Sequence, residues 1–146
     1  MSCSASRRSR HGRASAPAST SSSKRTLGRV ELFRNAPERA RELFLESLGL
    51  ADEVGYPELA AYCLSGLAEI ELASGAAERA ARLLGAAETV LEHVGARFQP
   101  LDQRSHDAAV ERAASALGEE AFGRLRAEGH ALGLDAVGEV LAGAAP

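Results

Sequence analysis

The chain has 146 residues, which is room for one domain, and its apolar share of 45% is ordinary for a globular protein. It contains no Trp, two Tyr and four Phe, so buried area must come from small and aliphatic side chains, which favours helix-on-helix packing over a β-sandwich or barrel. The formal net charge of −3 is unevenly spread, because residues 1–26 hold six basic residues and no acid, whereas residues 27–146 hold eleven arginines and twenty acids. The acidic balance of the larger part disfavours nucleic acid as its ligand.

Cysteine content and hydropathy indicate the cellular setting. The two cysteines, Cys3 and Cys63, fit neither a disulfide framework nor a zinc site, so a reducing cytoplasm is the expected location. No run approaches the roughly 18 apolar residues that span a bilayer, so no membrane partner is expected. Sixteen of the seventeen basic residues are Arg, which is typical of a GC-rich bacterial coding sequence.

Residues 1–26 are expected to form a disordered tail. They contain nine Ser and no Leu, Ile, Val or Phe, so they can neither offset the entropy of ordering nor supply the apolar core of a secretory signal. Their Ser/Arg-rich composition resembles an organellar transit peptide, but the apolar face of such a peptide is missing. Their positive charge would be attracted to nucleic acid or an acidic membrane, yet no aromatic residue is present for base stacking, so a solvated leader is the preferred interpretation.

An internal repeat begins at Leu27. Residues 27–55 align with residues 67–95, forty positions later, and ten of the twenty-nine aligned pairs are identical. A fixed period near forty, carried by small and aliphatic residues at helical spacing, predicts a stacked helical repeat. The identical pairs are Leu27/Leu67, Glu31/Glu71, Leu32/Leu72, Ala36/Ala76, Glu38/Glu78, Arg39/Arg79, Ala40/Ala80, Leu43/Leu83, Val54/Val94 and Gly55/Gly95.

Apolar spacing, prolines at helix starts and glycines at helix ends predict an all-α, antiparallel helix-pair solenoid over residues 27–142, with a flexible tail at 143–146. It would hold about two repeats, the first of them cut short, and a C-terminal helical cap that departs from the period, as the terminal unit of a solenoid must. The predicted helices cover residues 27–33, 37–54, 58–74, 77–94, 100–117, 119–132 and 134–141.

Within each unit the pattern resembles a tetratricopeptide repeat. The second unit matches that family's large, small and turn positions at Leu64, Leu67, Ala68, Gly75, Ala80, Leu84 and Ala87. The first unit matches at Leu27, Gly28, Ala40, Phe44 and Ser47, with Asn35 in place of the turn glycine. The family's Trp, its first-helix Tyr and its late Pro are absent, and the longer period resembles the variant found in large bacterial signalling regulators.

The resemblance is more specific towards the C-terminus. The stretch from Ala81 to Leu141, with ARLLGAAETVLEHVGA, Pro100 and ALGEEAFGRLRAEGHALGLDAV, is similar to the end of the repeat region in LuxR-type (MalT-like) transcriptional regulators and related ATP-dependent bacterial regulators. The chain has no Gly-rich phosphate loop ending in Lys and Ser/Thr and no DNA-reading module. The resemblance therefore implies the sensor or interaction segment of such a regulator, without its ATPase or DNA-binding functions.

No catalytic or metal site is expected. The spacings between His93, His106 and His130 are not those of a helical pair of metal ligands. Adjacent Glu119 and Glu120 would point about 100 degrees apart on a helix, so a favourable interaction with the helix N-terminus is preferred to a pair of catalytic carboxylates. No nucleophile, base and orienting group come together in the sequence, so we expect a protein that is not an enzyme and needs no cofactor.

Three residues within the predicted helices have structural interpretations. Cys63 has no base among its helical neighbours and is expected to be a buried, inert thiol. Gly66 and Gly85 each cost about 1 kcal/mol within a helix relative to Ala. We therefore expect them where a neighbouring helix has to approach closely.

By analogy with the family, the first helix of each unit lines a concave groove, which would expose Arg29, Tyr62, Ser65, Glu69 and Ala73. These residues are candidates for contact with a peptide or helix of a partner, and the alternative is that they merely face solvent. The leading hypothesis is thus a non-enzymatic module that binds another protein, or another domain of a regulator. A small-molecule sensor is the alternative.

The cut first helix has a further consequence. The cut should leave apolar surface around Leu27, Val30, Leu43 and Phe44 exposed. Two repeats and a cap also fall below the roughly three usually needed for independent stability. The sequence therefore predicts weak stability or self-association through the N-terminal repeat face.

Overall fold

The computed structural model describes residue 20 and residues 22–144, and no strand occurs among them. The all-α, helix-pair fold predicted from the repeat is confirmed, and the observed helix boundaries agree with the predicted ones to within a few residues except at the two ends. The helices are an N-terminal helix over residues 22–33, α2 (Pro37–Val54), α3 (Pro57–Ala73), α4 (Ala77–Val94), α5 (Pro100–Leu117), α6 (Glu119–Leu132) and α7 (Asp135–Ala144).

The two repeat units turn in the same way. Asn35 and Gly75, forty residues apart, both have a left-handed backbone, with φ of 62° and 88°. In each turn the next amide donates to a carbonyl five residues back, from Ala36 to Glu31 at 2.9 Å and from Ala76 to Glu71 at 2.8 Å. Asn tolerates this conformation better than other residues with a side chain, which explains how it replaces the turn glycine.

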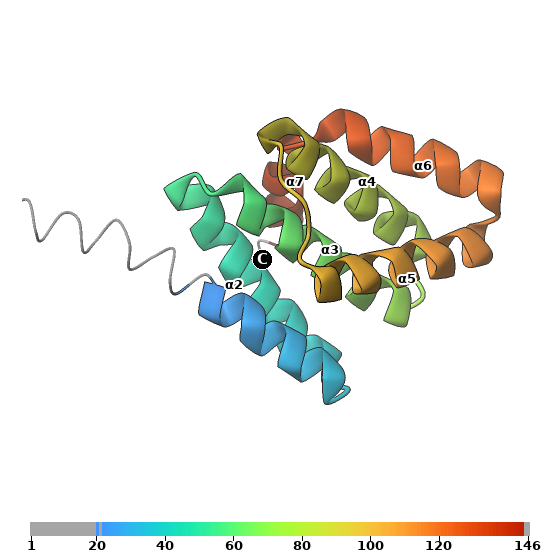
Figure 1. The fold of residues 1–146 in the computed structure, drawn as a ribbon. Helices are drawn as coiled ribbons and strands as arrows, with labels where there is room; N and C mark the ends of the chain where they lie inside the picture. Colours follow the sequence, from blue (N-terminus) through green and yellow to red (C-terminus); the bar gives the residue numbers. More distant parts are fainter. Residues whose placement is uncertain (1–19, 21, 145–146) are drawn as a thin grey trace, which may run out of the picture.

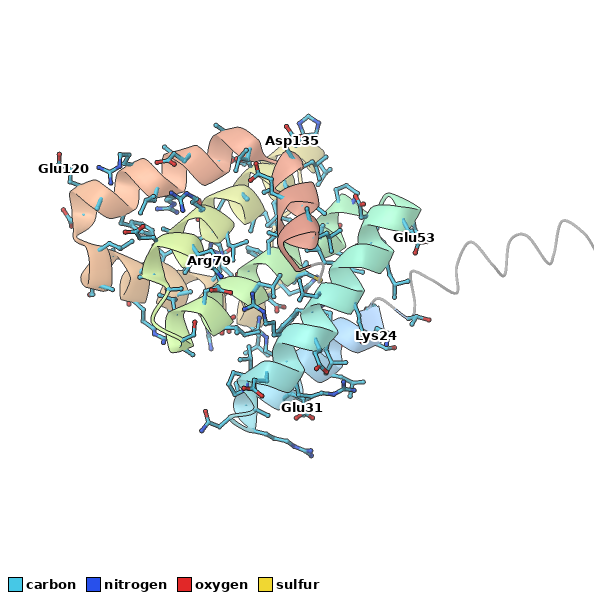
Figure 2. All side chains as sticks on the ribbon, turned by 180° about the vertical axis from the view of Figure 1, so that it is seen from behind. Lys24, Glu31, Glu53, Arg79, Glu120 and Asp135 are labelled. Atoms are coloured by element: carbon cyan, nitrogen blue, oxygen red, sulfur yellow. The ribbon has the colours of Figure 1, made fainter. Side chains whose placement is uncertain are left out.

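Helix α3 lies at the centre of the molecule. Its residues are buried on nearly every side, as expected of a helix that is apolar all round. Helix α2 packs on one side of it and α4 on the other, while α5 crosses both α3 and α4 (Figure 1). Helix α6 runs along α4, and the short α7 returns to contact α2 on the far side of the molecule (Figure 2).

Glycines set the closest helix crossings, as predicted for Gly66 and Gly85. A Cβ atom on Gly66 would lie 2.6 Å from the Phe44 ring, and one on Gly85 would lie 2.0 Å from the backbone oxygen of Arg126 in α6. The facing Gly129 is equally tight, since its Cβ would lie 1.9 Å from the Arg82 oxygen. The α4–α6 contact is therefore backbone against backbone at this crossing, and no side chain can be added at Gly85 or Gly129 without separating the two helices.

The N-terminal boundary differs from the prediction. Residues 22–26, assigned to the tail, are helical and continue into residues 27–33. Lys24 pairs with Glu46 of α2 at 2.6 Å, and Arg25 with Asp102 of α5 at 3.5 Å. These polar contacts hold a segment that has no apolar periodicity to reveal it as a helix. The rest of the predicted tail, residues 1–19 and 21, lies outside the described residues.

The extended first helix also corrects two of the four exposures predicted for the cut repeat. Leu43 and Phe44 are buried. The N-terminal helix packs closely on the Phe44 ring at Gly28, where an added Cβ atom would lie only 3.3 Å from it. Leu27 and Val30 are exposed, as predicted.

At the C-terminus, α7 continues to Ala144, so residues 143 and 144 of the predicted flexible tail are helical. Residues 145–146 fall outside the described part of the chain. Within the described residues, no helix combines the length and the apolar character needed to cross a bilayer.

Candidate functional site

The five residues predicted to line a groove lie on neighbouring faces of α3 and the N-terminal helix. Tyr62 and Ser65 are only 7% and 3% exposed. Glu69 and Arg29 are half-buried and form an ion pair of 2.5 Å across the two helices, whereas Ala73 is exposed at the end of α3. The structure thus brings four of the five together and leaves Ala73 apart.

The expectation that these residues would be open to a partner is wrong for Tyr62 and Ser65, because the protein's own cap covers them. The Phe98 ring packs edge-on against Tyr62 with centroids 5.0 Å apart, and the Gln99 amide donates to the Tyr62 hydroxyl at 2.9 Å. The segment before α5 therefore occupies the position where a bound peptide was expected. Whether the remaining positions contact a partner stays a prediction.

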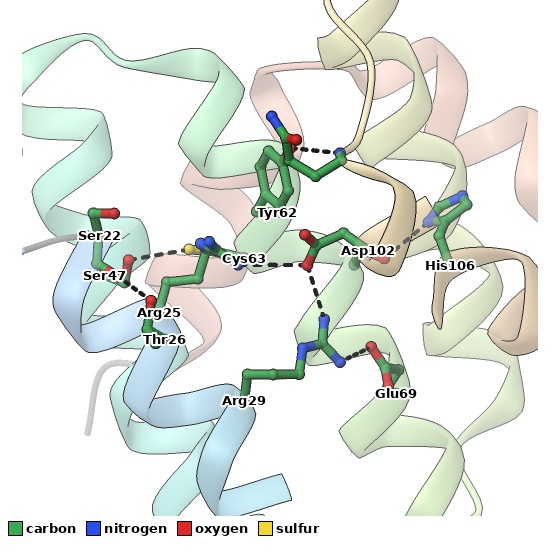
Figure 3. A network of polar contacts seen from close by, with 12 residues as sticks. Ser22, Arg25, Thr26, Arg29, Ser47, Tyr62, Cys63, Glu69, Asp102 and His106 are labelled. Atoms are coloured by element: carbon green, nitrogen blue, oxygen red, sulfur yellow. Dashed lines mark hydrogen bonds and ion pairs between the residues drawn. The ribbon is translucent and has the colours of Figure 1, made fainter. Parts of the chain in front are cut away.

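Two arginines of the N-terminal helix hold α5 in place over Tyr62 and Ser65 (Figure 3). Arg25 and Arg29 both approach the Asp102 carboxylate, at 3.5 and 3.8 Å, and the Arg25 guanidinium lies 4.7 Å from the centre of the Tyr62 ring. Burial raises the pKa of Glu69, and the neighbouring Arg29 opposes that rise. The predicted groove is thus a closed polar junction between the N-terminal helix, α3 and α5.

A second chain of polar contacts continues from Ser65 through the core. The Ser65 hydroxyl lies 2.8 Å from Nδ1 of His106, and Nε2 of the same ring lies 2.7 Å from the Glu88 carboxylate. Arg126 donates to both oxygens of that carboxylate, at 2.8 and 2.6 Å. Burial alone would raise the pKa of Glu88, but the hydrogen bonds from His106 and Arg126 outweigh it and lower the pKa to about 2.

This series of polar contacts corrects the expectation that no nucleophile, base and orienting group would come together. A hydroxyl, an imidazole and a carboxylate do meet, in the order that nucleophilic hydrolases use. Ser65 and His106 are nevertheless only 3% and 2% exposed, so a substrate carbonyl cannot reach the serine oxygen in this arrangement. What the contacts do is tie α3, α4, α5 and α6 together.

The other residues considered for chemistry are placed as follows. Cys63 is buried, as predicted, and burial raises its pKa to about 11, which leaves the thiol protonated at neutral pH. His130 pairs with Glu92 at 2.7 Å on the surface, and His93 is exposed. No three His, Cys, Asp or Glu side chains gather as metal ligands would within the part of the chain that the structure describes.

One face of the N-terminal helix exposes apolar side chains. We define the N-terminal repeat face as Leu27, Val30, Glu31 and Phe33. Leu27 is 51% exposed and Val30 is 37% exposed, and Phe33 is exposed almost entirely. Their spacing of three places them along one side of the helix.

The second repeat unit shows what normally covers this face. Leu67 and Ile70, the repeat equivalents of Leu27 and Val30, are 2% and 4% exposed. The carboxylate of Glu71, equivalent to Glu31, is bound by Arg41 from α2 of the preceding unit. In the first unit the described partner of Glu31 is Arg34, three residues further along, at 4.0 Å, and the neighbouring Leu27 and Val30 stay exposed.

The sequence analysis missed four polar residues: Arg25 and Asp102 at the closed groove, and Glu88 and Arg126 in the contacts through the core. No sequence pattern identifies these residues, because their contacts join positions 18 to 77 residues apart that lie in different helices. Comparisons with family models, with curated proteins and with solved structures each found no match.

Proposed function

We propose that this chain is a non-enzymatic, tetratricopeptide-like interaction module that binds a helix of a partner protein on its N-terminal repeat face. The observation that carries the proposal is the contrast between equivalent residues, since Leu27 is 51% exposed where Leu67 is 2% exposed. Apolar positions with helical spacing on an unpartnered helix fit an amphipathic helix better than an extended peptide.

The repeat also specifies the chemistry of the partner helix. In the covered unit, α2 presents small and apolar residues to α3 and places Arg41 on the Glu71 carboxylate. A partner on the N-terminal repeat face would by analogy place a basic residue on Glu31. Thr26 stands where Gly66 admits the Phe44 ring, so the partner needs a residue smaller than Phe at that point.

The resemblance to bacterial transcriptional and signalling regulators supports a setting for such binding. The partner helix would then belong to another domain or subunit of a regulator in the cytoplasm. The acidic balance of residues 27–146 argues against direct contact with nucleic acid. A small-molecule sensor is the second candidate, favoured by a cavity of about 360 Å³ between α7 and the repeats.

The test uses a probe made from the protein's own α2. A fluorescent peptide of residues 37–54 with Phe44→Ala, held helical by a side-chain cross-link between the exposed positions 42 and 46, is titrated into the full chain. We expect saturable binding by fluorescence anisotropy. Leu27→Glu together with Val30→Glu should weaken the binding at least tenfold.

A matched control and a charge exchange make the result specific. Leu101→Glu introduces a charge at another exposed apolar residue, 75% exposed on α5, and should leave binding unchanged. Glu31→Arg should weaken binding of the original probe and restore it for a probe carrying Arg41→Glu. Absence of binding, or equal binding by all variants, would refute the proposal.

A further inference from the structure

A cavity lies between the repeats and the C-terminal helices, on the side of the molecule away from the closed groove. It has a volume of about 360 Å³, at the lower end of the range of roughly 300–1,000 Å³ found for small-molecule sites. Helices α2, α3 and α4 form its inner wall, and α6 and α7 form its outer wall. Its apolar lining consists of Leu45, Leu67, Leu83, Leu132, Ala136 and Val140.

Arginines dominate the charged part of the same lining. Arg41, Arg79 and Arg82 reach the cavity, against the two acids Glu71 and Glu139. Glu71 is buried, and its two carboxylate oxygens are bound by Arg41 and, at 3.3 Å, by Arg79. This buried carboxylate fixes the two guanidinium groups at the cavity.

The arginines retain donors for a further anion. Each guanidinium carries five N–H groups, and Arg41 and Arg79 each use one terminal nitrogen on Glu71. Among the described residues, the ion-pair partner of Arg82 is the surface carboxylate of Glu128, at 3.5 Å. A carboxylate entering the cavity would therefore find planar guanidinium donors next to an apolar wall.

We propose that this cavity binds a medium-chain carboxylate, with its acyl chain against Leu67, Leu83 and Val140 and its carboxylate on Arg79 and Arg82. The apolar wall disfavours a small inorganic anion, which gains nothing from it. The lining contains no aromatic residue on which a nucleobase or sugar could stack. A cationic amphiphile would be repelled by the three arginines.

The repeat explains why the cavity forms here. In α4 the close approach of α6 depends on Gly85, whereas the equivalent residue of α2 is Leu45. A leucine at this point prevents the same close contact on α2, and Leu45 faces the cavity together with Ala136 and Val140 of α7. A bound acyl chain would fill that space and hold α7 against α2.

The experiment measures thermal unfolding of the full chain with sodium octanoate, octan-1-ol and octylammonium chloride at equal concentrations. Octanoate should raise the unfolding temperature in a saturable manner, because a ligand of the folded state alone stabilises that state. The alcohol should act more weakly and the amine should not stabilise. Equal effects of all three, or no effect of octanoate, would overturn the proposal.

Variants locate the binding site. Val140→Trp fills the cavity from the peripheral α7 and should abolish octanoate binding in calorimetric titration, and Arg79→Gln with Arg82→Gln should weaken it at least tenfold. Since Arg79 also supports Glu71, Arg82→Gln alone serves as the variant that preserves this pair. The matched control is Arg104→Gln with Arg124→Gln, which removes the same charge at exposed positions away from the cavity.

Two further comparisons distinguish binding in this cavity from binding to a lipid surface and from binding on the N-terminal repeat face. An acyl chain with an anionic head could also come from a membrane, so vesicles of phosphatidylglycerol form a parallel arm, and co-sedimentation without stabilisation by octanoate would overturn the proposal. The cavity is independent of the N-terminal repeat face. Leu27→Glu with Val30→Glu should therefore leave octanoate binding unchanged, even where it abolishes binding of the α2 probe.

Discussion

The two repeat units have related sequences and the same turns, yet residues at equivalent positions are buried to different extents. Leu67 is buried near Arg41 and Leu45 of α2, whereas half of its equivalent Leu27 is exposed to solvent. Gly85 admits α6, whereas its equivalent Leu45 lines a cavity. The environment of a repeat residue is thus determined by the neighbouring unit as much as by its own identity, and substitutions at equivalent positions should have unequal effects.

The largest effect is expected at the position where α4 meets α6. Gly85→Ala would place a methyl group 2.0 Å from the backbone oxygen of Arg126, which a flexible side chain cannot relieve, so α6 has to move. We expect a loss of at least about 3 kcal/mol in the free energy of unfolding, measured with urea. Gly49→Ala in α2 has no atom within 4 Å of its new Cβ and should gain up to about 1 kcal/mol.

The next effect tests the difference in burial directly. Leu67→Ala removes a side chain that is 2% exposed, and Leu27→Ala one that is 51% exposed. The first should lower the free energy of unfolding by about 3 kcal/mol and the second by less than about 1 kcal/mol. Equal losses in denaturant titrations would mean that the first unit is covered in solution.

A third contrast concerns Glu88, which stands in the second unit where the first has the buried Leu48. Folding lowers the pKa of Glu88 from 4.5 to about 2. The ionised carboxylate therefore adds to the free energy of unfolding above about pH 5, and this contribution is lost as the pH falls from about 5 to about 2. The side chain is 21% exposed, so we expect a contribution of about 2 kcal/mol at neutral pH.

The measurement is the dependence of unfolding free energy on pH. Glu88→Gln should lower stability at pH 7 and flatten the decline between pH 5 and pH 2. Glu92→Gln is the matched control, since Glu92 also lies on α4 and pairs with a residue of α6, His130, but on the surface with its side chain 65% exposed. Its effect should stay below about 0.5 kcal/mol, and a larger one would argue against burial as the cause.

Much of the fold follows from local sequence. Prolines at helix starts, left-handed residues at the turns and the internal period predict the helices from Pro37 onward, and Gly66 and Gly85 predict close crossings. The closure of the groove does not follow, because it depends on pairs such as Ser65 with His106 that no local pattern links. The start of the first helix also escapes prediction, since residues 22–26 carry no apolar residue and are fixed by charges on α2 and α5.

The return of α7 to α2 limits how this architecture can lengthen. An extra unit inserted between α2 and α6 would carry the C-terminal helix away from its contact on the first unit. A unit added ahead of the N-terminal helix would leave that contact intact and would cover Leu27 and Val30, which are exposed there. Duplication of a unit ahead of the N-terminal helix is therefore compatible with the α2–α7 contact, whereas insertion between α2 and α6 is not.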